Sequence, residues 1–171
     1  LPLLVSGAAI GVNWILLFEA YRYTTVAIAT LCYYMAPVIV ILLAPVLLKE
    51  KMTVKKTVCA AVAVVGMLLV SGVFDGGAAT GGNGKGIVFG LGAACFYATA
   101  MLTNKFMKDI SAYDKTIMQL GVAAGGGLPY SLITSGVQEF AVLTVPQILL
   151  LLAVGIVHTG IAYWLYFGSM D

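Results

Sequence analysis

The sequence predicts an all-α, polytopic membrane protein with about six transmembrane helices. Its 171 residues are 61% hydrophobic and 9% charged, whereas soluble domains carry about 25% charged residues. One uncharged run, residues 26–48, would extend roughly 34 Å as a helix, which is enough to cross the hydrocarbon core of a bilayer. The net charge of +2 lies in short loops and forms no basic face, so nucleic acid is not indicated as a partner.

The first predicted span, about Leu3 to Tyr21, carries polar residues that are unusual in a membrane helix. Asn13 and Trp14 lie near its middle, while Glu19 and Arg22 lie toward its end, where their spacing lets them meet on one helical face. An ionisable residue within a span costs roughly 3 kcal/mol to insert and is a functional candidate by default. Glu19 and Arg22 are therefore predicted to act in gating or proton coupling. The alternative is a hydrated ion pair at the membrane interface.

The second span, Val26 to Leu48, contains Tyr33, Tyr34, Pro37 and Pro45. Pro37 removes the hydrogen bond to the carbonyl of Tyr33 and is expected to kink the helix near the middle of the membrane. Opened backbone is tolerated there if it faces protein or a water-filled cavity, which makes this region a candidate substrate site. The alternative is that both prolines only shape helix packing.

Four further spans follow. A flexible glycine-rich linker at residues 74–85 separates the third span of the chain from the fourth. The expected bounds of these four spans are Val54–Val73, Gly86–Asn104, Thr116–Thr134 and Pro146–Gly168. The glycine run at residues 125–127 weakens the fifth helix, but a closely packed helix would use such small residues. Close helix contacts are likewise predicted at three GxxxG pairs, Gly7 with Gly11, Gly86 with Gly90 and Gly121 with Gly125.

Basic residues determine the predicted orientation. Seven of the nine Lys and Arg residues fall in two loops, at residues 49–56 and 105–115, which six crossings would put on the same side. Arg22 and Lys85 fall on the opposite side. Because basic loops stay in the cytoplasm, both ends of the chain are predicted to be cytoplasmic, in a bacterial plasma membrane.

An internal repeat is also indicated. Shifting the chain by 149 residues aligns residues 1–22 with residues 150–171, with identities at Leu3, Val5, Gly11, Leu16 and Phe18. On the predicted orientation the two aligned helices cross the membrane in opposite directions. Inverted repeats of this kind are typical of secondary transporters.

The residues of the first half also carry a family resemblance. The run FEAYRYTTVAIATLCYYMAPVIVILLAPVLLKEKMTVKK, preceded by Asn13 and Trp14, resembles the EamA branch of the drug/metabolite transporter superfamily. Its most specific stretch is Ala36-Pro37, with Glu50 just past the helix. The later stretches GKGIVFGLGAACFYATAMLTNKF and GIVHTGIAYWLYFGSM look like the start of that family's second repeat.

The resemblance implies a ten-helix fold of two inverted five-helix repeats. On that frame residues 1–73 are the last three helices of the first repeat, residues 74–85 are the linker, and residues 86–171 are the first three helices of the second repeat. Two helices would be absent at each end, so the chain is expected to be a fragment. The implied activity is transport of a small metabolite, an amino acid or related solute or a drug, by alternating access. Efflux is expected, and uptake is the second choice.

A substrate cavity is expected where the two repeats meet. The residues expected to line it offer amide hydrogen bonds, aromatic surface or a titratable ring, and they are Asn13, Trp14, Tyr33, Tyr34, Pro37, Tyr97, Gln119, His158 and Tyr163. The alternatives are that aromatic residues anchor the helices at the membrane interface and that His158 bonds only a neighbouring helix.

Other functional classes fit less well. An enzyme is not predicted, because the chain has one histidine and no paired acids within its spans, and no metal or cofactor is expected. A channel would need a filter-like sequence, and the chain contains none. A structural or assembly subunit, or a truncated transporter without activity, is the alternative. The expected partners are a small-molecule substrate and the lipid bilayer, with a homo-oligomer left open.

Overall fold

The computed structural model describes residues 1–49, 51–70, 84–107, 110–136 and 142–161. These residues form helices and connecting turns, with no β-strand among them. Three helical stretches of the described chain are long and apolar enough to cross a membrane: Pro2–Tyr23, Val26–Leu47 and Gly84–Lys105. The predicted all-α membrane fold is therefore confirmed.

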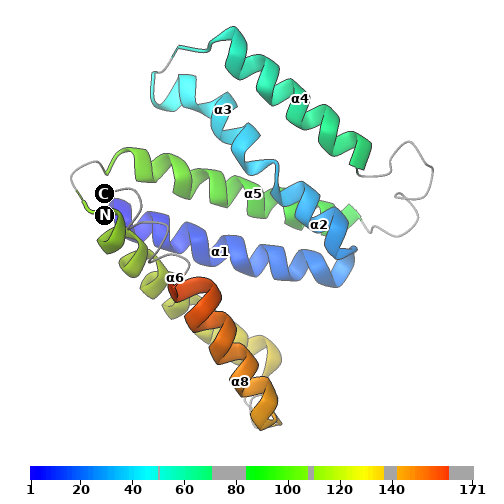
Figure 1. Ribbon diagram of the computed structural model, residues 1–171, viewed down its shortest axis with the longest axis vertical. Coiled ribbons are helices and arrows are strands. Elements are labelled where there is room, and N and C mark those ends of the chain that lie inside the picture. The colour runs from blue at the N-terminus through cyan, green and yellow to red at the C-terminus, as the bar shows by residue number, and fades with distance from the viewer. Residues whose placement is uncertain (50, 71–83, 108–109, 137–141, 162–171) are drawn as a thin grey trace.

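Helices α1 (Pro2–Tyr23) and α5 (Gly84–Lys105) form the centre of the molecule and lie side by side (Figure 1). They run in opposite directions. At one end the Ser6 hydroxyl donates to the carbonyl of Ala100 at 3.4 Å. At the other end the rings of Tyr23 and Phe89 stack with their centroids 5.6 Å apart. The other helices that contact α1 or α5 pack around this antiparallel pair.

Small residues on α5 allow the close approach of its neighbours. In lipid no hydrophobic force drives helices together, so contact depends on backbones coming near one another. Helix α2 (Val26–Tyr33) and helix α3 (Ala36–Leu47) pack along α5, and α4 (Val54–Val70) packs against α3. A Cβ on Gly86 would lie 2.7 Å from the Cβ of Thr24, and one on Gly90 would lie 2.8 Å from the Cβ of Cys32. The close contact predicted for this glycine pair is confirmed.

Replacing Gly90 by Ala is expected to destabilise the protein. The added methyl group overlaps Cys32 and the Ala29 carbonyl, and overpacking of about 1–3 kcal/mol outweighs the helix-propensity gain of about 1 kcal/mol. Gly92→Ala is the matched control on the same helix, because its new Cβ would lie 3.5 Å from Leu16, an ordinary contact. Denaturant unfolding in detergent micelles measures both variants. Equal midpoints would contradict the packing described here.

The second predicted span is interrupted where Pro37 was expected to kink it. Helix α2 ends at Tyr33, and α3 begins at Ala36 with Pro37 in its first turn. Because Pro37 has no N–H, it cannot bond the Tyr33 carbonyl, and its ring crowds that oxygen. Between the two helices the Met35 N–H donates to the Cys32 carbonyl at 3.1 Å, a tighter turn than that of an α-helix. Pro45 lies inside α3 without ending it.

Helix α6 (Ala112–Ser135) runs beside α1 in the same direction. It begins where the Ser111 hydroxyl accepts from the Asp114 N–H at 3.2 Å. A Cβ on Gly7 would lie 2.7 Å from the Cβ of Val122, and one on Gly11 would lie 3.2 Å from the Cα of Ala123. The close contact predicted for this pair of α1 glycines is confirmed, and so is the predicted fifth helix.

The close packing predicted for the glycines of α6 itself is wrong for the described chain. No described atom outside the helix lies within 4 Å of a Cβ built on Gly121, Gly125, Gly126 or Gly127. The reason is that α1 meets α6 on the face that carries Val122 and Ala123, and the small residues of α1 provide the room there.

The last described elements are α8 (Val145–Ala153) and the π-helix η2 (Val154–Ile161). Gln147 caps the start of α8, since its Oε1 accepts from the Thr144 N–H at 2.8 Å and from the Thr144 hydroxyl at 2.9 Å. The sixth span was predicted as one helix to Gly168, but the described part changes from α to π geometry at Val154, and residues 162–171 lie outside the described residues. Most of the predicted linker also lies outside them, while Gly84 and Lys85 belong to α5 rather than to the linker.

Candidate functional site

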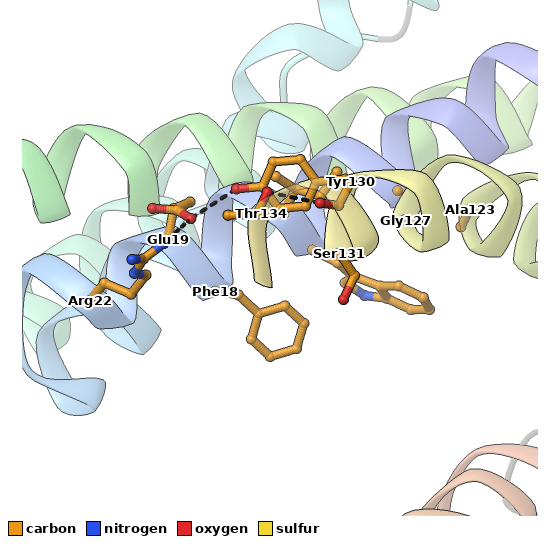
Figure 2. Close-up of a pocket in the computed structure, with 11 residues that line it drawn as sticks. Phe18, Glu19, Arg22, Ala123, Gly127, Tyr130, Ser131 and Thr134 are labelled. Carbon is orange, nitrogen blue, oxygen red and sulfur yellow. Dashed lines mark hydrogen bonds and ion pairs between the residues drawn. The ribbon is translucent and has the colours of Figure 1, made fainter. Parts of the chain in front are cut away.

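A cavity of about 560 Å³ lies between α1 and α6. Its lining comes from these two helices alone: Gly11, Trp14, Ile15, Phe18, Glu19 and Arg22 on α1, and Ala123, Gly127, Tyr130, Ser131 and Thr134 on α6 (Figure 2). Trp14, Glu19 and Arg22 were predicted as site residues from the sequence, and the structure brings these three together.

The cavity forms because the two helices are close at one end and separate toward the other. Their backbones are in contact at Gly7 and Gly11, opposite Val122 and Ala123. Beyond that contact α1 presents the larger residues Trp14 and Phe18, and the Tyr130 side chain reaches across to Glu19. The cavity therefore extends along α1 from Gly11 to Arg22, near the end of the helix.

The outer end of the cavity is polar. Oε1 of Glu19 accepts two hydrogen bonds, from Nη1 of Arg22 at 2.9 Å and from the hydroxyl of Tyr130 at 2.8 Å. The Glu19 side chain is 16% exposed and the Arg22 side chain is 64% exposed, so the guanidinium marks the side nearer to solvent. The predicted pairing of Glu19 with Arg22 is confirmed, while the predicted role in gating or proton coupling stays a prediction.

The other part of the lining is apolar. Trp14 and Ile15 come from one turn of α1 and Phe18 from the next, and Gly127 leaves room opposite them on α6. Cavities that combine apolar walls with a few placed polar groups are typical small-molecule sites, and this volume lies within their usual range of about 300–1,000 Å³. The arrangement suits a small solute with an apolar body and one polar or charged end.

Asn13 and Gln119, both predicted as substrate ligands, lie elsewhere. Asn13 is fully buried, and its Nδ2 donates to the Ala93 carbonyl on α5 at 2.7 Å. Gln119 is buried as well, and its Nε2 donates to the Ser6 hydroxyl at 2.7 Å and to Oδ1 of Asn104. Neither residue lines the cavity. The structure shows both as polar contacts between helices, and a role toward solute stays a prediction.

Three predicted tyrosines gather at the break in the second span. The Tyr33 ring lies 5.3 Å from the Tyr97 ring on α5 and 6.3 Å from the Tyr34 ring, measured between centroids. Tyr34 is exposed, and Pro37 follows it within one turn. The structure therefore brings these four predicted residues to one place on α2, α3 and α5, apart from the lining of the cavity.

The remaining predicted residues are at the end of the chain. His158 lies on η2, and its side chain is outside the described part of the structure. Tyr163 lies outside the described residues. Within the described chain no three His, Cys, Asp or Glu side chains come together in a way that would hold a metal ion.

The cavity contains residues that the sequence reasoning missed, chiefly Tyr130, Ser131 and Thr134. A signal for them exists in the sequence. Together with Ala123 and Gly127 they repeat at spacings of three and four, which puts them on one face of a helix. Three hydroxyl groups at the end of an apolar, glycine-rich span are a polar stripe that points to a contact other than lipid.

Comparison with known proteins agrees with these observations. Residues 1–72 match the EamA-like transporter family. The chain is also 34% identical over 170 residues to a protein named "Uncharacterized transporter YxxF" from Bacillus subtilis (strain 168). That alignment covers 99% of this chain and 53% of the relative, so the chain spans about half the length of the relative. No solved structure matches the chain. The chain is therefore similar to EamA-like transporters, over residues 1–72 by the family match and over nearly all of its own length by this relative.

Proposed function

We propose that the protein is a transporter of a small amphipathic metabolite and that its solute path runs through the cavity between α1 and α6. The single observation that carries the proposal is the composition of this cavity. It has an aromatic wall at Trp14 and Phe18, and the paired groups of Glu19, Arg22 and Tyr130 form its polar end. The membrane fold and the match of residues 1–72 to the EamA-like transporter family support the same reading.

The proposed substrate class is an amino acid, a related solute or a drug-like molecule. An apolar body would lie against the aromatic rings of α1. A charged end would meet the carboxylate of Glu19 or the guanidinium of Arg22, which carry opposite charges. The cavity therefore favours solutes that combine apolar and ionic parts over fully polar ones.

The proposed mechanism is alternating access in the efflux direction. In transporters built from inverted repeats, alternating access is largely a rocking of one repeat against the other around the substrate site. The antiparallel pairing of α1 with α5 and the parallel pairing of α1 with α6 are the directions that six alternate crossings would give. We further propose that residues 1–73 and 86–171 belong to inverted repeats and that both ends of the chain are cytoplasmic.

We further propose that the Asn13 side chain changes hydrogen-bond partners during transport. Its Oδ1 is buried and accepts no hydrogen bond in the described chain. An unsatisfied buried acceptor costs about 1–3 kcal/mol, so a state in which this oxygen gains a donor would be favoured. Gln119, the four residues at the helix break, His158 and Tyr163 stay candidates for contact with solute in such a state.

Flux in proteoliposomes tests the proposed function. The purified protein is reconstituted and supplied with a panel of radiolabelled solutes, including aromatic and aliphatic amino acids, organic amines and fully polar sugars. We expect saturable movement of at least one amphipathic solute and none of the sugars, relative to empty liposomes. Folded, correctly inserted protein that moves no amphipathic solute would contradict the proposal and favour an assembly subunit.

A further inference from the structure

We propose that Tyr130 and Glu19 form a latch that limits the separation of α1 and α6 at the outer end of the cavity and thereby controls entry of solute. The inference rests on the proposed function, because it assigns a gate to the same cavity. Tyr130 acts in it as a positioning residue. It holds a neighbouring helix in place through Glu19.

The two helices have a natural pivot. At Gly7 and Gly11 the backbones of α1 and α6 are so close that added Cβ atoms would overlap or crowd Val122 and Ala123. At the same end the Gln119 amide donates to the Ser6 hydroxyl at 2.7 Å. Glycine contacts without long side chains let one helix tilt on another with little loss of packing. The separation of the helices away from this point is therefore not fixed by the pivot itself.

The bond from Tyr130 to Glu19 fixes that separation. Two side-chain hydrogen bonds between described residues join α1 to α6 near opposite ends of their contact, the bond of Gln119 to Ser6 at the pivot and the bond of Tyr130 to Glu19 at the far end. Figure 2 shows the Tyr130 side chain reaching from α6 to the carboxylate on α1, with a dashed line between them. Breaking this bond would leave the outer end without a polar link.

Arg22 has a different role in the latch. It lies on the same helix as Glu19, so its ion pair cannot hold α1 to α6. It shares Oε1 with Tyr130 and stands largely exposed, where ion pairs are weak. The link between the helices is therefore the phenol bond. An uncharged acceptor at position 19 would still permit it.

Labelling of a cysteine inside the cavity measures the latch without any solute. Ser131→Cys puts a thiol of similar size on the lining, and the same protein without it gives the background from the three native cysteines. A membrane-impermeant, cationic thiosulfonate reagent is applied to the membrane-embedded protein. Loss of a hydrogen bond to a charged group should shift the open population enough to speed labelling about tenfold in Tyr130→Phe.

Companion variants separate the latch from general disruption. Glu19→Ala should speed labelling as much as Tyr130→Phe, and the two together should give no further increase, because each removes the same bond. Glu19→Gln keeps an oxygen that accepts from Tyr130, in a weaker neutral bond, and should label more slowly than Glu19→Ala. Thr134→Val, which alters the lining but not the link between the helices, should label close to the parent rate.

The outcomes distinguish the gate from the transport function. Unchanged labelling in both Tyr130→Phe and Glu19→Ala, with protein still folded and inserted, overturns the latch even if solute flux continues. Fast labelling in Glu19→Gln equal to that in Glu19→Ala also overturns it, since the charge and not the bond would then matter. If labelling follows the expected pattern but no solute is transported, the latch is supported and only the proposed function is contradicted.

Discussion

Replacing Gln119 by Ala is expected to lower the free energy of unfolding by about 2–4 kcal/mol. Its amide donates to Ser6 on α1 and to Asn104 on α5, so one buried side chain on α6 joins three helices. Hydrogen bonds between membrane helices average only about 0.6 kcal/mol, but here the substitution also leaves a void, and Oδ1 of Asn104 loses one of its two donors, Ser6 being the other. The void and the lost bonds act together, and we expect their sum to exceed the average.

Met118→Ala is the matched control, because this neighbouring residue of α6 is exposed. Unfolding in detergent micelles measures both variants. A double variant that combines Gln119→Ala with Asn104→Ala should lose less stability than the sum of the losses in the two single variants, because the two residues share a bond. A Gln119→Ala midpoint equal to that of Met118→Ala would mean that the cluster does not hold the helices together.

Much of the fold follows from local features of the sequence. The uncharged runs gave the spans, and the bounds of α1 and α5 differ from the predicted ones by two residues or fewer. The break before Ala36 was predictable because proline removes a donor at a known offset. The pairing of Glu19 with Arg22 was predictable because residues three apart share a helical face.

Features that depend on how helices pack were not predictable in the same way. Which face of α6 meets α1 is decided by the fit of Gly7 and Gly11 against Val122 and Ala123, and this fit leaves no mark in either helix alone. The same register puts Tyr130 against Glu19, 111 residues away in the sequence. Asn13 and Gln119 are polar as well, but they bond neighbouring helices and do not line the cavity.

Replacing Gly127 by Trp is expected to reduce solute flux at least about tenfold, which corresponds to about 1.4 kcal/mol of lost binding. Gly127 lines the cavity, and no described atom outside the helix lies within 4 Å of a Cβ at this position. The new side chain therefore starts without a clash at its Cβ, and the indole would occupy the cavity of about 560 Å³. Filling that space removes the volume in which the apolar part of a solute would lie.

Gly125→Trp is the matched control. It makes the same change on the same helix, two residues away on the other side. No described atom outside the helix lies within 4 Å of a Cβ built there, and Gly125 does not line the cavity. Both variants carry the same change in helix propensity. Their amounts in the membrane are compared before flux is measured.

The flux of a transported solute in proteoliposomes that contain Gly127→Trp or Gly125→Trp tests most directly whether the path runs between α1 and α6. We predict that Gly127→Trp loses flux while Gly125→Trp keeps it, at equal protein content. Equal flux through both variants would contradict the account, because solute would then cross without using this cavity.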